Sequence, residues 1–174
     1  GRHRSGVPEA RVAQTLGNPR DQRQISLIAV HAHGIPDDFP ESVIAETVRL
    51  DEPVMAGRTD LRDVPLLTID PVDARDHDDA VFAEPDADPK NSGGYMVIVA
   101  IADVSHYIRP GSRLDREAQL RGNSVYFPDR VVPMLPEKIS NDLCSLRELE
   151  ERPCLAVRMV FGADGEKRSH TFLR

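Results

Sequence analysis

The sequence has 174 residues, 40% of them hydrophobic and 29% charged, with a formal net charge of −7. This length permits one domain with a real core or pieces of two domains. The longest apolar run, residues 96–102, is too short to span a bilayer, and no signal peptide pattern opens the chain, so we expect no membrane association. The net charge disfavours a generic nucleic-acid binder, which needs clustered Lys and Arg.

The cysteines point to the cellular compartment. Cys144 and Cys154 have neither the spacing of a zinc site nor the pattern of a disulfide framework. We therefore expect a reducing, cytoplasmic setting.

The first third of the chain begins with a polar and basic segment, residues 1–24, which contains a possible strand at 12–16. Residues 25–30 are predicted to form a strand, and residues 31–36 a connector. A helix is expected over 40–49 because its apolar residues fall on one side. His31 and His33 could ligate a metal, but no third ligand stands at a zinc-like spacing.

From residue 66 the pattern becomes β-rich and indicates an α+β fold. Strands are predicted at 66–69, 80–83, 95–103, 154–161 and 167–173, with a hairpin tip at 85–94 and a turn at 162–165. The strand at 95–103 is apolar throughout, which suits a central strand covered on both faces. Ser112, Asp115 and Gly122 give the start and stop signals of a short helix.

Four carboxylates stand close together between two of these strands: Asp70, Asp76, Asp78 and Asp79. Carboxylates this close raise each other's pKa unless a cation lies between them, and Mg²⁺ or Mn²⁺ prefers such oxygen ligands. A solvated surface turn is the alternative, but the apolar flanks favour a metal site. The spacing excludes an EF-hand loop and a phosphatase of the D-x-D type.

Two further residues leave alternatives open. Asp103, at the end of the 95–103 strand, is either a turn former or a wall residue of the catalytic cavity. Arg75, inside the acidic segment, either pairs with a neighbouring Asp or reaches a phosphate, and pairing is the expected outcome.

Three ordered blocks then carry a family resemblance. Residues 56–81, with the pattern D-A-R-D-x-D-D at 73–79, resemble the catalytic motif of the RNase II/RNase R (RNB) family of exoribonucleases. Two further blocks of that family are also resembled, one by residues 99–107 and the other by residues 121–128, 132–136 and 143–146. The amino acids in these blocks are closer to the RNase R branch. Pro71, Val72 and His77 depart from the usual residues, but no carboxylate is lost.

The resemblance implies an α+β fold in which a partial RNB catalytic domain with a mixed or antiparallel sheet follows the remnant of an OB-type cold-shock barrel. The implied division is a cold-shock remnant at 1–24, a connecting segment with a short helix at 25–60, and the N-terminal part of the RNB domain at 61–174. The catalytic and metal-ligating residues would be Asp70, Asp76, Asp78 and Asp79. Tyr126 would stack on the 3′-terminal nucleotide, whereas from its sequence context alone a core role is the default.

The resemblance also implies a function for the intact protein: processive, Mg²⁺-dependent 3′→5′ hydrolysis of single-stranded RNA to nucleoside 5′-monophosphates, with Mn²⁺ as a possible substitute. Its partner would be single-stranded or structured RNA, with no obligate protein partner, and the 174 residues alone would be inactive. The rival hypothesis is a non-catalytic RNA-binding or scaffold module that keeps the fold. Four crowded carboxylates argue against the rival, because a binding module gains nothing from facing them toward phosphates.

Overall fold

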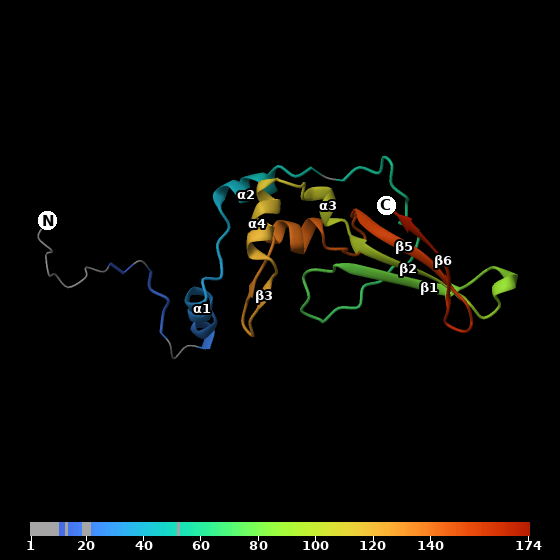
Figure 1. The fold of residues 1–174 in the computed structure, drawn as a ribbon, viewed down its shortest axis with the longest axis horizontal. Coiled ribbons are helices and arrows are strands. Elements are labelled where there is room, and N and C mark those ends of the chain that lie inside the picture. Colours follow the sequence, from blue (N-terminus) through green and yellow to red (C-terminus); the bar gives the residue numbers. More distant parts are fainter. Residues whose placement is uncertain (1–10, 13, 19–21, 52) are drawn as a thin grey trace, which may run out of the picture.

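A four-stranded antiparallel sheet forms one end of the elongated molecule, and a group of short helices forms the other (Figure 1). This computed structural model describes residues 11–12, 14–18, 22–51 and 53–174. The elements, in chain order, are α1 (Gln22–Ala32), α2 (Glu41–Val48), β1 (Asp79–Pro85), the 3₁₀ turn η1 (Pro89–Asn91), β2 (Tyr95–Ala102), α3 (Val104–Tyr107), α4 (Arg113–Arg121), β3 (Val125–Tyr126), β4 (Val131–Val132), the π-helical turn η2 (Ile139–Leu143), β5 (Cys154–Phe161) and β6 (Lys167–Leu173).

The main sheet has the strand order β1-β2-β5-β6, with every neighbouring pair antiparallel. Side chains alternate between its two faces, so Met96, Ile98 and Ala100 point to one face and are buried there. Residues 61–66 cross this face and pack against them. The sheet therefore has one closed face, which holds one of the two cores of the chain.

The opposite face of the sheet is only partly covered. Ile101, Leu155 and Phe172 lie on it and are each about half exposed or more. The prediction that the 95–103 strand is covered on both faces is therefore wrong within the described residues. Its position as an inner strand is confirmed, and its continuous apolar run reflects that position.

The second core lies among the helices. Leu114 of α4 and Ile139 of η2 are fully buried, and they pack with Val43 of α2 and Tyr107 of α3. Helix α4 has the predicted cap, because the Ser112 hydroxyl accepts a hydrogen bond from the Asp115 N–H at 3.1 Å. It ends at Gly122, whose φ of 76° favours glycine.

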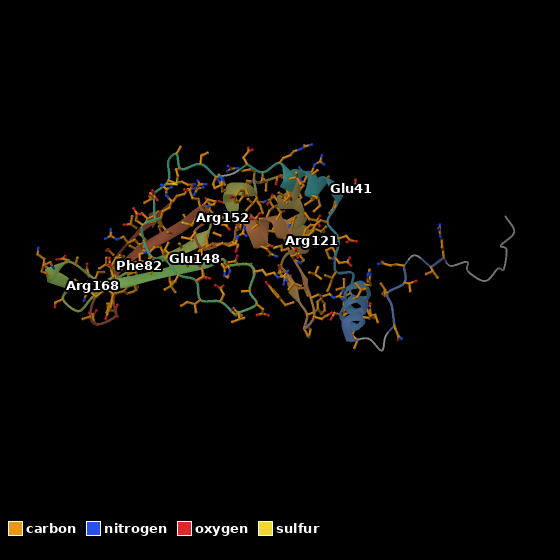
Figure 2. All side chains as sticks on the ribbon, turned by 180° about the vertical axis from the view of Figure 1, so that it is seen from behind. Glu41, Phe82, Arg121, Glu148, Arg152 and Arg168 are labelled. Atoms are coloured by element: carbon orange, nitrogen blue, oxygen red, sulfur yellow. The ribbon has the colours of Figure 1, made fainter. Side chains whose placement is uncertain are left out.

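Arg121, at the end of α4, ties the connector after α1 to the helical core (Figure 2). Its Nη1 donates to the carbonyl oxygens of Pro36 at 2.7 Å and Pro133 at 3.1 Å, and its Nη2 donates to that of Asp38 at 2.6 Å. The guanidinium also lies 3.7 Å from the centroid of the Phe39 ring, a cation–π distance. One side chain thus fixes the chain path before α2 against the β3–β4 hairpin.

Three of the predicted strands are wrong within the described residues, and two of these lie in the first third of the chain. Residues 25–30 belong to helix α1, in which Ser26 and Val30 are buried one turn apart while Ile25 is exposed. A six-residue apolar run does not distinguish a strand from a helix. The strand predicted at 12–16 is also absent from its described residues, and most of the predicted cold-shock segment lies outside the described residues.

Residues 66–69 form one isolated bridge rather than a strand. Leu67 exchanges two backbone hydrogen bonds with Val81, at 3.0 and 2.9 Å, and the chain then leaves the sheet. Ile69 is 84% exposed, so the apolar flank does not continue into the interior. The predicted helix at 40–49, the hairpin at 85–94, and the strands at 80–83, 154–161 and 167–173 are confirmed. None of the helices in the described segments is long and apolar enough to cross a bilayer.

Candidate functional site

The acidic loop, residues 70–79, runs from just after the Leu67 bridge to the first residue of β1. Its incoming side carries Asp70, and its outgoing side carries Asp76, Asp78 and Asp79. The bridge between Leu67 and Val81 holds the two sides together at the base of the loop. The four predicted site carboxylates therefore share one loop anchored on the sheet.

Backbone hydrogen bonds fasten the outgoing side of the loop to two distant segments. The hydroxyl of the fully buried Ser145 accepts from the His77 N–H at 3.1 Å and donates to the Arg75 carbonyl at 3.2 Å. The Leu146 N–H donates to the His77 carbonyl at 2.8 Å, and the Ala102 N–H donates to the Asp78 carbonyl at 2.9 Å. The loop is thus held by the segment after η2 and by the end of β2.

Asp70 is the only one of the four with a side-chain partner inside the acidic loop among the described contacts. Its Oδ2 lies 2.9 Å from His77 Nδ1. Hydrogen bonds from His77 and then Thr68 lower the pKa of Asp70 below its ordinary value. Asp70 is therefore ionised at neutral pH.

Asp78 is shifted in the opposite direction. Partial withdrawal from water and the charges of Asp76, Asp79 and Asp70 raise the pKa of Asp78 above its ordinary value. The charges of the other three carboxylates therefore all act on Asp78. A cation between them would relieve this repulsion.

The donor set fits Mg²⁺ or Mn²⁺, which are bound by carboxylate oxygens. Within the part of the chain that the structure describes, however, no three His, Cys, Asp or Glu side chains form a group ready to hold a metal ion. The carboxylates are thus gathered on one loop without being closed into a cage. His31 and His33 form no such group either; His31 Nε2 lies 3.7 Å from an Asp37 carboxylate oxygen.

Tyr126 lies on a separate element, the β3–β4 hairpin, where it pairs with Val131 (Figure 1). The turn is closed by the Phe127 N–H, which donates to the Arg130 carbonyl at 2.8 Å. The Tyr126 residue is 70% exposed, so it does not serve the core role that is the default for a tyrosine. Its ring is available to a ligand from solvent.

Asp103 lies at the turn that starts α3, as one of its two interpretations expects, because its carbonyl accepts from the His106 N–H at 2.9 Å. Its buried carboxylate also serves as a counter-ion. Its Oδ2 lies 2.9 Å from Arg58 Nη2 and 3.2 Å from Arg174 Nε, and the Ser105 hydroxyl donates to its Oδ1 at 2.6 Å. Burial alone would raise the pKa of Asp103, but the hydrogen bonds from Ser105 and Arg58 and the charge of Arg174 lower it to about 2. Asp103 thereby joins β2 to the segment that crosses the closed face.

Arg75 is tied down by its backbone rather than its side chain. Its carbonyl accepts from Ser145, while the side chain is exposed and shows no ion pair with a neighbouring Asp among the described contacts. Sequence reasoning missed the roles of Ser145 and His77. Ser145 stands in the quoted block at 143–146, but nothing in the sequence alone says that this block reaches the acidic loop.

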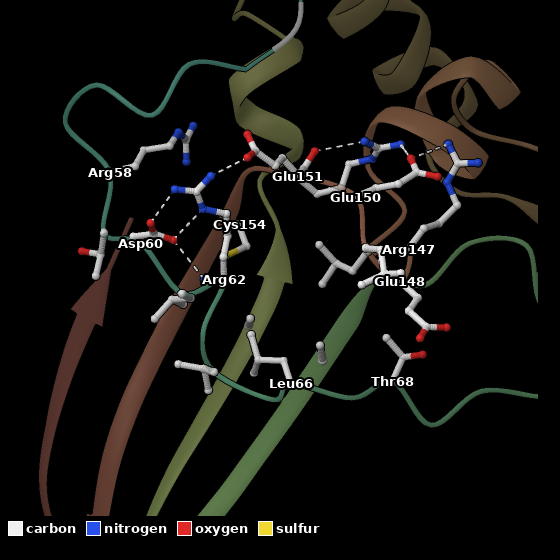
Figure 3. A pocket seen from close by; sticks show the side chains of 18 of the residues that line it. Arg58, Asp60, Arg62, Leu66, Thr68, Arg147, Glu148, Glu150, Glu151 and Cys154 are labelled. Atoms are coloured by element: carbon white, nitrogen blue, oxygen red, sulfur yellow. Dashed lines mark hydrogen bonds and ion pairs between the residues drawn. The ribbon is translucent and has the colours of Figure 1, made fainter.

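The closed face of the sheet also carries a hollow of about 760 Å³, which sequence reasoning did not predict (Figure 3). Its floor is apolar, with Leu66, Ala80 and Ala100 among the lining residues. Charged side chains form its rim, and they pair with each other: Arg62 lies 2.7 Å from Asp60 and 2.5 Å from Glu151. These three rim charges therefore pair within the chain.

Comparison with known proteins finds one matching family model and several similar proteins. The family model described as "RNB domain" matches residues 58–174. Ribonuclease R of Vibrio parahaemolyticus is 48% identical over 164 residues, which cover 92% of this chain and 19% of the relative; ribonuclease R of Escherichia coli is 45% identical over 166 residues, covering 93% and 20%. The chain thus spans about a fifth of the length of these relatives.

A solved structure agrees with the sequence comparison. The structure of Mycoplasma genitalium RNase R in complex with double-stranded RNA superposes with a TM-score of 0.83 at 31% identity, covering 92% of this chain and 28% of that one. The fold described above is therefore similar to that of a segment of this solved structure.

Proposed function

Because the chain belongs to the RNB domain family, we propose that the intact protein is a metal-dependent, processive 3′→5′ exoribonuclease that hydrolyses single-stranded RNA to nucleoside 5′-monophosphates. The observation that carries this proposal is the acidic loop, on which partial withdrawal from water and then the charges of Asp76, Asp79 and Asp70 raise the pKa of Asp78. A loop fastened by Ser145 and carrying unneutralised carboxylates suits a divalent cation better than a solvated turn.

Asp70, Asp76, Asp78 and Asp79 would hold Mg²⁺, or Mn²⁺ in its place, through their carboxylate oxygens. When bound, such a metal activates a water, orients the scissile phosphate and stabilises the leaving 3′-oxygen. The chain itself contributes placement: the backbone contacts of Arg75, His77 and Asp78 keep the outgoing side of the loop fixed. Fixed carboxylates need little reorganisation during the reaction.

Tyr126 would grip the 3′-terminal nucleotide by stacking, a contact that tolerates any base. Its exposure on the β3–β4 hairpin supports this role, because an exposed ring can accept a base without unfolding a core. The hairpin is braced by the Met134 N–H, which donates to the Ser124 hydroxyl at 2.9 Å. The tyrosine is therefore presented on a supported element.

RNA is the proposed partner, either single-stranded or structured. The M. genitalium relative was solved with double-stranded RNA and with ribose-methylated single-stranded RNA. We place the reaction in the cytoplasm, since both cysteines are free, as expected in a reducing compartment. The 174 residues alone are expected to be inactive, because they span about a fifth of their relatives and carry a net charge of −7, which repels RNA.

A chimera tests the proposal. This chain replaces its aligned segment in E. coli ribonuclease R, and the purified chimera is incubated with a 5′-labelled single-stranded oligonucleotide in Mg²⁺ or in EDTA. Stepwise digestion to mononucleotides and a short end product, in Mg²⁺ only, is the expected result; the isolated chain should leave the oligonucleotide intact. A folded chimera that binds the RNA but never shortens it would favour the non-catalytic module instead.

A further inference from the structure

The two sides of the acidic loop are joined by one side-chain contact among those described. Asp70 stands on the incoming side, and the other three carboxylates stand on the outgoing side, six or more positions later. His77, which lies among the outgoing residues, reaches back so that its Nδ1 is 2.9 Å from Asp70 Oδ2. Without this contact, Asp70 would be linked to the outgoing side only through the Leu67–Val81 bridge at the base of the loop.

The reaching residue is itself held firmly. The His77 N–H donates to the Ser145 hydroxyl at 3.1 Å, and the His77 carbonyl accepts from the Leu146 N–H at 2.8 Å. Ser145 is fully buried, so this anchor belongs to the interior rather than to a solvated surface. A side chain whose backbone is fixed on both sides can set the position of its partner.

The ionised state of Asp70 determines which partner donates the hydrogen bond between His77 and Asp70. An ionised carboxylate only accepts hydrogen bonds, so the His77 Nδ1 carries the hydrogen and donates it to Asp70. The hydrogen bonds from His77 and Thr68 use two of the roughly four lone pairs of the Asp70 carboxylate. The remaining lone pairs stay available for a cation.

We propose that His77 is a positioning residue, which holds Asp70 against the outgoing side of the acidic loop so that Asp70 can join the carboxylates of that side when a divalent cation binds. This inference rests on the proposed function and deepens it. Residues that hydrogen-bond to a metal ligand orient that ligand and tune the affinity of the site for the metal. The proposal assigns this task to His77. A purely structural role would instead change the stability of the loop and leave cation affinity unaltered.

Mn²⁺ is the probe, and the 174-residue chain is the protein tested. The free Mn²⁺ signal in electron paramagnetic resonance gives the dissociation constant for the wild type and for three variants: His77→Phe, which keeps a ring but has no donor; His77→Asn, whose amide N–H lies near the position of Nδ1; and His77→Gln, whose amide lies further out. His33→Phe, a change at an exposed histidine remote from the loop in sequence, is the matched control.

The expected result is a dissociation constant roughly tenfold higher for the Phe and Gln variants. The Asn variant and the His33 control should stay close to the wild type. In an Asp70→Asn background, His77→Phe should add nothing, because a residue that acts through Asp70 loses its effect when that carboxylate is gone. If the Phe variant does not fold, as judged by circular dichroism, the contrast between Asn and Gln decides the matter.

The outcomes separate this inference from the proposed function. If Asp78→Asn weakens Mn²⁺ binding while every His77 variant binds like the wild type, the positioning role is overturned and the metal site stands. Equal effects of Asn and Gln also overturn it, as does a full His77→Phe effect in the Asp70→Asn background. If the wild type shows no Mn²⁺ binding, or if Asp78→Asn leaves binding unchanged, both proposals are overturned.

Discussion

The acidic loop and the rim of the closed-face hollow are both rich in charge, but they balance that charge differently. At the rim, Arg62 pairs with Asp60 and Glu151, and Arg152 pairs with Glu150. In the loop, partial withdrawal from water and the charges of three other carboxylates raise the pKa of Asp78, and a single histidine contacts one of the four carboxylates. A charged cluster that neutralises itself holds a fold together, whereas one that does not is prepared to accept a ligand.

The sharpest way to test this contrast is to remove one charge from the unbalanced cluster. Asp78→Asn in the chimera is expected to lower the hydrolysis rate by at least about 100-fold, since the change keeps the size of the side chain but removes a charge used in catalysis. RNA affinity, measured by a filter-binding assay, should be nearly unchanged. Hydrolysis within a few-fold of the unsubstituted chimera would show that the metal assignment is wrong.

Asp103 offers the next largest effect, on stability rather than on rate. Asp103→Asn leaves the largely buried Arg58 guanidinium without its counter-charge, so the free energy of unfolding should fall by about 3 kcal/mol. Urea denaturation of the 174-residue chain measures this change. A loss well below 1 kcal/mol would mean that the pair contributes little.

The lowered pKa of Asp103 also predicts that the protein loses stability as the pH falls. The pKa of this carboxyl is lowered from 3.8 to about 2 on folding, so its contribution is fully present above pH 4 and is lost as the pH falls toward 2. The loss corresponds to about 2 kcal/mol. Thermal melts between pH 5 and pH 2 should show a smaller decline in Asp103→Asn than in the wild type; parallel declines would assign the acid sensitivity to other groups.

Tyr126→Ala in the chimera is expected to leave turnover largely intact and to lengthen the shortest end product. The loss of one stacking contact costs about 1–3 kcal/mol at the terminal nucleotide. A denaturing gel of the digestion products measures the change, and Val131→Ala on the partner strand is the matched control for hairpin stability. An unchanged product ladder with a much lower melting temperature would return Tyr126 to a structural role.

The smallest effect is expected at the hollow. Arg62→Gln removes a cation from the self-neutralised rim, where its side chain is 55% exposed and its ion pairs are screened by water, so the melting temperature should stay close to that of the wild type. Chimera activity should stay at the unsubstituted level. A large loss of activity would show that the hollow, rather than the loop alone, serves the reaction.

Local signals account for what the sequence predicted correctly in the fold. Helix α4 follows from its Ser112 cap and its Gly122 end, and β2 follows from its apolar run between turn residues. The strand predicted at 25–30 failed because a short apolar run fits both periodicities until its neighbours are known. The strand predicted at 66–69 failed because a strand needs a partner along its length, and only Leu67 finds one.

The candidate site, like the fold, could be predicted only in part from the sequence. The four aspartates are visible in the sequence because they crowd within ten residues. The anchor on Ser145 is not, because it joins positions 68 and 70 residues apart, and only the folded chain brings them together. The contact between His77 and Asp70 is local, but nothing in the spacing shows which way the ring turns.

Paramagnetic broadening by Mn²⁺ tests most directly whether the acidic loop is the cation site. Amide resonances of the ¹⁵N-labelled 174-residue chain are recorded as Mn²⁺ is added. If the acidic loop binds the cation, residues 70–79 should broaden first, together with Ser145 and Ala102, which contact the loop, and Asp78→Asn should delay this effect. Broadening that begins around His31 and Asp37, or that reaches the rim of the hollow before the loop, would contradict this assignment.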